Sequence, residues 1–148
     1  MIKSFRGLIQ DGAQQIIRLS TNDGKTGYTI KKLQLLPYTP GHTKNLEIAF
    51  QVFSTKRTAA IPTAGATIDF SDPTLLAAAF YVSDTSHANA SSLDVVFDNM
   101  KINQDIFVTM TDNEGSESYV NYYIELEQVK LDIHEATVAT LKDMRGRE

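Results

Sequence analysis

Cysteine is absent from the 148 residues of this chain. The absence excludes disulfides, thiolate metal sites and a thiol nucleophile, and it leaves the redox compartment open, because a fold without cysteine tolerates either. A chain of this length is about one domain and can bury roughly 68–70% of the surface that it exposes when unfolded. The core therefore needs no covalent cross-link.

Long apolar runs and a strong charge of one sign are also missing. No stretch approaches the roughly 20 apolar residues of a membrane-spanning helix, and MIKSFRGLIQDG at 1–12 lacks the apolar core of a signal peptide. With 14 basic and 18 acidic residues the chain is mildly acidic, and its short basic pairs at 31–32 and 56–57 are too few for a nucleic-acid face. We expect a soluble protein, made in the cytosol, that binds neither nucleic acid nor membranes.

No catalytic motif is recognisable. HEATV at 134–138 begins like the HExxH zinc motif, but Val138 stands where the second histidine ligand would be. The sequence also has no GxSxG elbow, no phosphate-binding lysine loop and no GxGxxG turn. We therefore predict that the protein is not an enzyme and uses neither a cofactor nor a metal.

Acidic residues near turns are candidate calcium ligands, because hard cations bind clustered oxygens. The candidates are Asp23, Asp69, Asp72, Asp98, Asp112 and Glu114. TNDGKTG at 21–27 is too short for an EF-hand loop and lacks its closing glutamate. We expect instead that these carboxylates cap turns and keep loops solvated. The three histidines, His42, His87 and His134, are far apart in sequence, and we expect each in or near a loop.

Short segments rich in β-branched and aromatic residues recur between turn signals, which is typical of an all-β protein. LEIAFQVF at 46–53 alternates apolar and polar residues and is the clearest strand. Residues 15–20 and 28–36 flank TNDGKTG, whose Asn, Asp and Gly residues favour a turn, so the three segments predict a hairpin.

The second half of the chain continues this pattern with one interruption. Asp72 and Pro73 precede an alanine-rich run, which predicts a short helix over 73–79. Residues 92–99 and 105–112 predict two further strands, and DNEGSES at 112–118 predicts a hairpin loop leading into the next one.

These segments predict an all-β fold, an antiparallel β-sandwich of jelly-roll type with seven or eight strands, one short internal helix and a short C-terminal helix. We expect a sandwich domain over 1–133 and an amphipathic helix and tail over 134–148. The residues expected in its core are Leu46, Ile48, Phe50, Val52, Ile106, Val108, Tyr122, Ile124 and Leu126.

The stretch NYYIELEQVKLDI at 121–133 changes phase near Glu127 and Gln128, because its apolar residues move from even to odd positions. A β-bulge would explain the change, since one extra residue reverses which side chains point inward. A similar change occurs across Lys31 and Lys32. Ordinary bulges at a sandwich corner are one interpretation, and strands shared between the body and a partner are the other.

Residues 135–144 predict a short amphipathic helix, in which apolar residues recur at three-residue intervals. A helix of about ten residues is marginal alone in water, so it must pack on its own sandwich or on a neighbour. The apolar residues after the phase change need a cover, which this helix or a second copy could supply. We favour a homo-oligomer with the helix at the subunit contact. The candidate interface residues are Val129, Leu131, Ile133, Val138, Leu141 and Met144.

Several stretches resemble small β-rich virion structural proteins of tailed bacteriophages that infect marine bacteria. They are MIKSFRGLI, STNDGKTGYTIKKLQL, VFDN followed by INQDIFVTMTD, and NYYIELEQVKLDIHEATVATLKDMR. The resemblance spans most of the chain, but no catalytic motif anchors it, and it supplies no catalytic residues.

The resemblance implies a structural part of a phage particle, such as a capsid decoration or cement subunit assembled in many copies. Its partners would be copies of itself and other virion proteins such as the major capsid protein, and it would reside in the virion after synthesis in the host cytoplasm. A receptor- or glycan-binding sandwich of a tail or fibre is the alternative, because such a module would also be a compact β domain without an active site.

Overall fold

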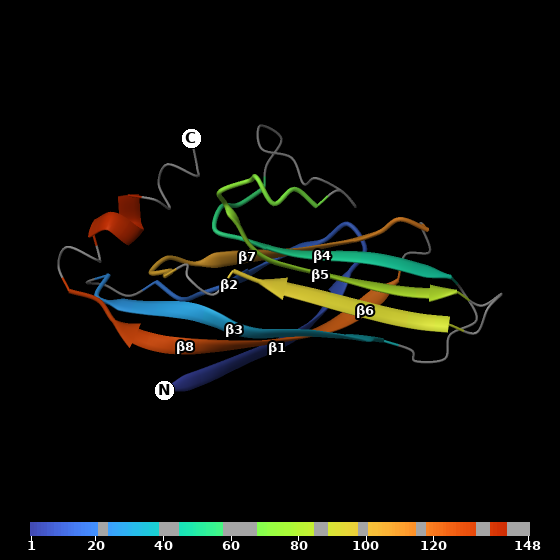
Figure 1. Cartoon of the computed structure of the whole chain (residues 1–148), viewed down its shortest axis with the longest axis horizontal. Helices are drawn as coiled ribbons and strands as arrows, with labels where there is room; N and C mark the ends of the chain where they lie inside the picture. The colour runs from blue at the N-terminus through green and yellow to red at the C-terminus, as the bar shows by residue number, and fades with distance from the viewer. Residues whose placement is uncertain are drawn as a thin grey trace.

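Strands dominate the computed structural model, which describes residues 1–20, 24–38, 45–57, 68–84, 89–97, 101–114, 118–132 and 137–141. The described strands are β1 (Ile2–Gln10), β2 (Gln14–Ile17), β3 (Thr26–Pro37), β4 (Leu46–Phe53), β5 (Leu75–Asp84), β6 (Asn89–Val96), β7 (Ile106–Asp112) and β8 (Tyr119–Lys130) (Figure 1). Every pairing between these strands is antiparallel. The all-β expectation is therefore confirmed.

The strands form two sheets that stack as a sandwich. One sheet has the order β1-β8-β3, and the other has the order β2-β7-β4-β5-β6 (Figure 1). The pairing is nested: the first strand pairs with the last, the second with the seventh, and the fourth with the fifth. As a result, the chain crosses repeatedly from one sheet to the other.

The core lies between the two sheets. All nine residues predicted for it are buried there, namely Leu46, Ile48, Phe50, Val52, Ile106, Val108, Tyr122, Ile124 and Leu126. Phe50 of β4 and Tyr122 of β8 meet across the sandwich, with ring centroids 5.2 Å apart. This aromatic contact joins the middle strands of the two sheets.

The helix predicted over 73–79 is wrong, because Leu75 begins strand β5. The backbone N–H of Thr74 donates to Asp72 Oδ1 over 2.9 Å, and the guanidinium of Arg57 donates to Asp72 Oδ2 over 2.9 Å. Asp72 thus caps a turn that leads into a strand. The alanines that follow are buried between neighbouring strands, and tertiary packing of this kind overrides intrinsic helix propensity.

Both predicted hairpins are also wrong. β2 pairs with β7 and β3 pairs with β8, so β2 and β3 belong to different sheets. The segment between β7 and β8 likewise passes from one sheet to the other. Turn residues predict where the chain reverses, but they do not specify which strands form a ladder.

The phase change in β3 is confirmed as a bulge at Lys31: Ile30 pairs with Leu126, whereas Lys32 pairs with Glu125. The extra residue turns Leu33 toward the core, where it is fully buried. The bulge predicted in β8 is wrong, because the register runs without interruption past Glu127 and Gln128.

Residues 137–141 form a helical turn within the predicted helix, and the rest of the predicted span lies outside the described residues. Among the residues that the structure describes, no helix is long and apolar enough to span a bilayer.

We expect Phe50→Ala to lower the free energy of unfolding by about 3–5 kcal/mol, because it removes a fully buried ring and leaves a cavity beside Tyr122. Urea unfolding followed by circular dichroism measures the loss. Ile16→Ala is the control, since Ile16 is 42% exposed. A loss for Phe50→Ala no larger than that of the control would contradict the central position of this ring.

Candidate functional site

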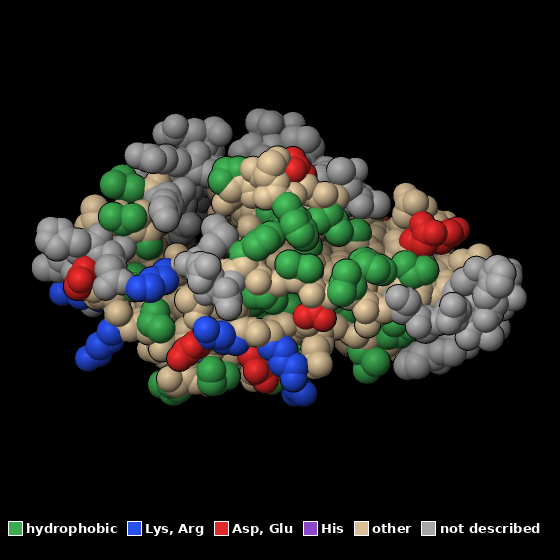
Figure 2. Space-filling view, viewed as in Figure 1, with side chains coloured by type: hydrophobic (Ala, Val, Ile, Leu, Met, Phe, Trp, Pro, Cys, Tyr) green, Lys and Arg blue, Asp and Glu red, His purple; other side chains and the backbone are tan. Residues whose placement is uncertain are grey.

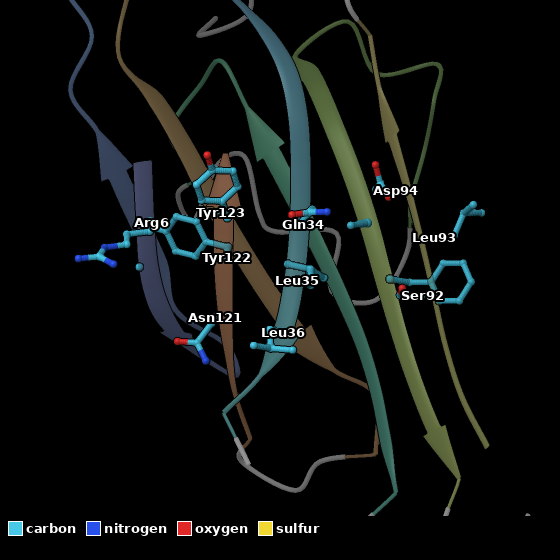
Figure 3. Close-up of a pocket in the computed structure, with 13 residues that line it drawn as sticks. Arg6, Gln34, Leu35, Leu36, Ser92, Leu93, Asp94, Asn121, Tyr122 and Tyr123 are labelled. Atoms are coloured by element: carbon cyan, nitrogen blue, oxygen red, sulfur yellow. The ribbon is translucent and has the colours of Figure 1, made fainter. Parts of the chain in front are cut away.

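The edge strands β3 and β6 belong to different sheets but lie against each other along one side of the sandwich. A cleft of about 810 Å³ opens at this seam. Figure 3 shows β3 in the middle, with cleft residues of β1 and β8 on one side and those of β6 on the other. The lining residues come from five strands: Arg6, Gly7, Gln34, Leu35, Leu36, Ala79, Phe80, Ser92, Leu93, Asp94, Asn121, Tyr122 and Tyr123.

Small inner-face residues explain why the sandwich opens here. Ala79 of β5 belongs to the core, and Asp94 lies directly opposite it on β6, which places both on the inner face of the sheet. Ser92 is placed in the same way, because it pairs with Tyr81, which also packs against the core. Alanine and serine fill less volume than the leucines and isoleucines elsewhere between the sheets, so the interior is not close-packed at this end.

Two tyrosines add hydrogen-bonding groups to the cleft. Burial raises the pKa of Tyr122, whose hydroxyl donates to Gln15 Oε1 over 2.8 Å. The hydrogen bond from the Tyr123 hydroxyl to Glu125 Oε1, over 2.8 Å, raises the pKa of Tyr123. Both phenols therefore keep their protons at neutral pH and donate them to Gln15 and Glu125, so each hydroxyl oxygen can serve a ligand only as an acceptor.

Apolar side chains are exposed on the same side of the molecule. Figure 2, drawn in the orientation of Figure 1, shows hydrophobic side chains gathered near its middle, around β5 and β6. Leu93 of the cleft rim is 57% exposed. Phe70 is 56% exposed and meets Phe97 edge to face, with ring centroids 5.1 Å apart. The cleft and its surroundings thus form a mixed apolar and polar surface.

The candidate interface residues are divided by the C-terminal helical turn. Leu131 is buried against Ala139, and Val129 packs partly on this pair. Val138 and Leu141 point away and are 53% and 49% exposed. Ile133 and Met144 lie outside the described residues. The helical turn therefore covers Leu131 with Ala139 and leaves two apolar side chains in solvent.

Asn103, which no motif of the sequence marks, anchors this helical turn. Its side chain is fully buried, and its amide donates to Thr140 Oγ1 over 2.8 Å and to the carbonyl of Gly24 over 3.1 Å. Gly24 has a φ of 65°, a left-handed conformation that glycine adopts without strain. A single buried amide thus joins segments that are far apart in sequence.

The acidic candidates act mainly as caps of turns. Asp69 accepts from Ser71, Asp72 accepts from Thr74, and Asp112 accepts from the backbone N–H of Glu114. Within the described residues, no group of three or more His, Asp or Glu side chains is arranged to hold a metal ion. Asp23, Asp98 and the three histidines lie outside the described residues.

Asp105 is a further capping carboxylate, at the start of β7. Its Oδ1 accepts from the backbone N–H groups of Leu19 and Ser20, over 2.8 and 2.9 Å, and from the Ser20 hydroxyl. Burial alone would raise the pKa of Asp105, but these hydrogen bonds and nearby Arg18 outweigh it and hold the pKa below its usual value. The ionised form therefore stabilises the fold.

Comparison with known proteins identifies no family, since no family model and no curated protein sequence matches the chain.

We expect Ala79→Val to raise the thermal midpoint by about 2–4 °C, because two added methyl groups would fill part of the cleft and contribute about 1 kcal/mol. Ala78→Val is the matched control. Ala78 is also 4% exposed, but it belongs neither to the cleft lining nor to the core cluster. The two added methyl groups would have no cleft to fill there, so they should overpack their surroundings and lower the thermal midpoint of Ala78→Val. Calorimetry measures both, and equal effects of the two variants would contradict the cleft as unfilled space.

We expect Asp105→Ala to lower the free energy of unfolding at pH 7 by about 1–3 kcal/mol, through loss of hydrogen bonds to a charged acceptor. Because the pKa of Asp105 is lowered on folding, its contribution is present above the unfolded pKa and is lost as the pH falls through the folded value. The difference from the parent should therefore shrink below about pH 3.8. Urea unfolding across pH, with the exposed Asp94→Ala as control, measures it; a difference that is constant with pH would contradict the charge effect.

Proposed function

We propose that this protein is a non-enzymatic structural subunit of a bacteriophage particle, a capsid decoration or cement subunit assembled in many copies. The virion role rests on the resemblance of most of the chain to small β-rich virion proteins. The strand pairing is the structural observation that supports it, because nested sandwiches recur in viral capsid and lectin domains.

We infer that the sandwich is of jelly-roll type. An eight-stranded jelly roll nests its pairs as first with eighth, second with seventh, third with sixth and fourth with fifth. Three of these pairs are present here. The exception is β6, which forms its ladder with β5 and only lies against β3. In this proposal the protein is a jelly roll whose third and sixth strands have separated.

Its proposed partners are copies of itself and other virion proteins such as the major capsid protein, and its proposed location is the virion, after synthesis in the host cytoplasm. The outward side of the C-terminal helical turn supports self-association. Val138 and Leu141 expose apolar surface there, while Ala139 and Thr140 hold the turn to the body. A second copy would remove that apolar surface from water.

We expect the full-length protein to be a homo-oligomer. The double variant Val138→Ser, Leu141→Ser should dissociate at a higher protein concentration than the parent, because burial of these two side chains contributes to the contact. Light scattering coupled to size-exclusion chromatography measures the mass. Ile16→Ser is the control, since Ile16 is also partly exposed but lies on β2. A full-length protein that is monomeric at high concentration would rule out this contact.

Copurification tests the virion role itself. The protein should remain with purified particles, and its copy number should be a multiple of the number of symmetry-equivalent positions that it occupies. Mass spectrometry of the particles measures that number. Absence of the protein from particles formed in cells that express it would overturn the proposal.

A receptor- or glycan-binding module is the second candidate, and the cleft is the observation that favours it. Gln34, Ser92 and Asp94 can exchange hydrogen bonds with hydroxyl groups beside an apolar floor. A glycan array would distinguish the two candidates. Specific glycan binding that Asp94→Ala abolishes would favour this module.

A further inference from the structure

The outer edge of β3 has backbone groups that no ladder uses among the residues that the structure describes. Tyr28 uses this edge in a bridge to Ile102, with N–H to O distances of 2.7 and 2.8 Å in the two directions. Beyond it, from Ile30 to Pro37, the described residues provide a ladder on the β8 side alone. β6 likewise pairs with β5 alone among the described residues. Two strand edges that have no ladder partner in the described part of the chain thus flank the cleft.

Protection against edge pairing covers only the first part of β3. The bulge at Lys31 and the charges of Lys31 and Lys32 disturb a regular ladder, and such features discourage edge-to-edge association. The next residues, LQLL at 33–36, carry no charge and no proline, and Gln34, Leu35 and Leu36 line the cleft. This short part of the edge can accept another strand.

The space beside this edge suits the side chains of an added strand. Side chains of a strand alternate between its two faces, so every second residue of a strand paired with β3 would point between the sheets. There it would meet Leu35, Ala79 and Tyr122, which are apolar over most of their surface, and Asp94 on β6. Asp94 is exposed, and among the described residues no cation forms a salt bridge with it.

We propose that the seam binds an extended segment of another protein chain, which pairs with β3 at 33–36 and inserts alternate side chains into the cleft. The segment has apolar residues on the inserted face and one lysine or arginine among them, opposite Asp94. Backbone hydrogen bonds to β3 would supply affinity, and the cleft would select the side chains, as in other cases of strand addition. This inference stands without the virion role.

A second copy of the folded protein fits the seam less well. Antiparallel pairing of two β3 edges at 33–36 would place Lys32 opposite Pro37, which has no N–H to donate to the ladder. Pairing of two β6 edges about Asp94 would place the two Asp94 carboxylates opposite each other, where like charges repel. Either arrangement would also leave the clefts unfilled, so it would gain no dispersion contacts there. A single extended segment fills the cleft and avoids these unfavourable pairings.

A peptide with the sequence Thr-Val-Thr-Lys-Thr-Val-Thr, blocked at both ends, is the probe. Its valines and lysine share one face, and threonine favours a strand. Titration into the ¹⁵N-labelled full chain should give saturable shifts at residues 33–36 of β3 and 92–96 of β6. No saturable shift at about 1 mM peptide would overturn the proposal, as would shifts confined to other strands.

Two altered peptides separate backbone pairing from side-chain binding. N-methylation of alternate residues removes backbone donors, and it should weaken binding by about tenfold or more if a ladder forms. Equal binding of the methylated peptide would overturn strand addition and indicate a cleft that recognises side chains alone. Replacing the lysine by glutamate should weaken binding by about two- to fivefold, the range of an exposed charge pair.

The protein variant Asp94→Asn tests the assigned partner of the lysine. It should weaken binding of the lysine peptide and abolish the difference in affinity between the lysine and glutamate peptides, as expected for two groups that interact directly. Asp132→Asn, a charge-matched control outside the cleft lining, should leave that difference unchanged. A difference that survives in Asp94→Asn would overturn the assignment of Asp94.

Discussion

The whole structure depends on the burial of two apolar sheet faces against each other. Phe50 and Tyr122 form the contact at its centre, from the middle of one sheet to the middle of the other. The bulge at Lys31 serves this contact, because without the extra residue Leu33 would point into solvent. The repeated crossing of the chain between sheets has the same effect, since it supplies each sheet with strands from both halves of the chain.

Polar groups hold the segments that connect the strands, where no apolar face is available. Arg57 lies over the ring of Phe53, with its guanidinium carbon 3.5 Å from the ring centroid, and forms an ion pair with Asp72. The turn before β5 is thereby fixed to the end of β4. Asn103 does the same for the C-terminal helical turn. These contacts join residues distant in sequence, so they form only when the sandwich has folded.

Relaxed packing at one seam gives the protein its most distinctive surface. Where β5 and β6 carry Ala79 and Ser92, the sheets are not filled between their inner faces, and the edges of β3 and β6 remain without a shared ladder. A cleft that opens beside small side chains and is bordered by strand edges is suited to binding an extended chain. The same small residues that loosen the core thus create a place for a partner.

The sequence by itself determined the fold class, the core and most strands, since alternation in LEIAFQVF and IFVTMTD reports directly which side chains are buried. The sequence identified the apolar residues of the candidate interface, but it did not predict that Ala139 covers Leu131. The cleft was missed, although the small residues Ala79 and Ser92 were its signal. Only the tertiary structure decided the pairing of the strands and the extended conformation of the alanines. Both depend on neighbours that are distant along the chain, and a local pattern carries no information about them.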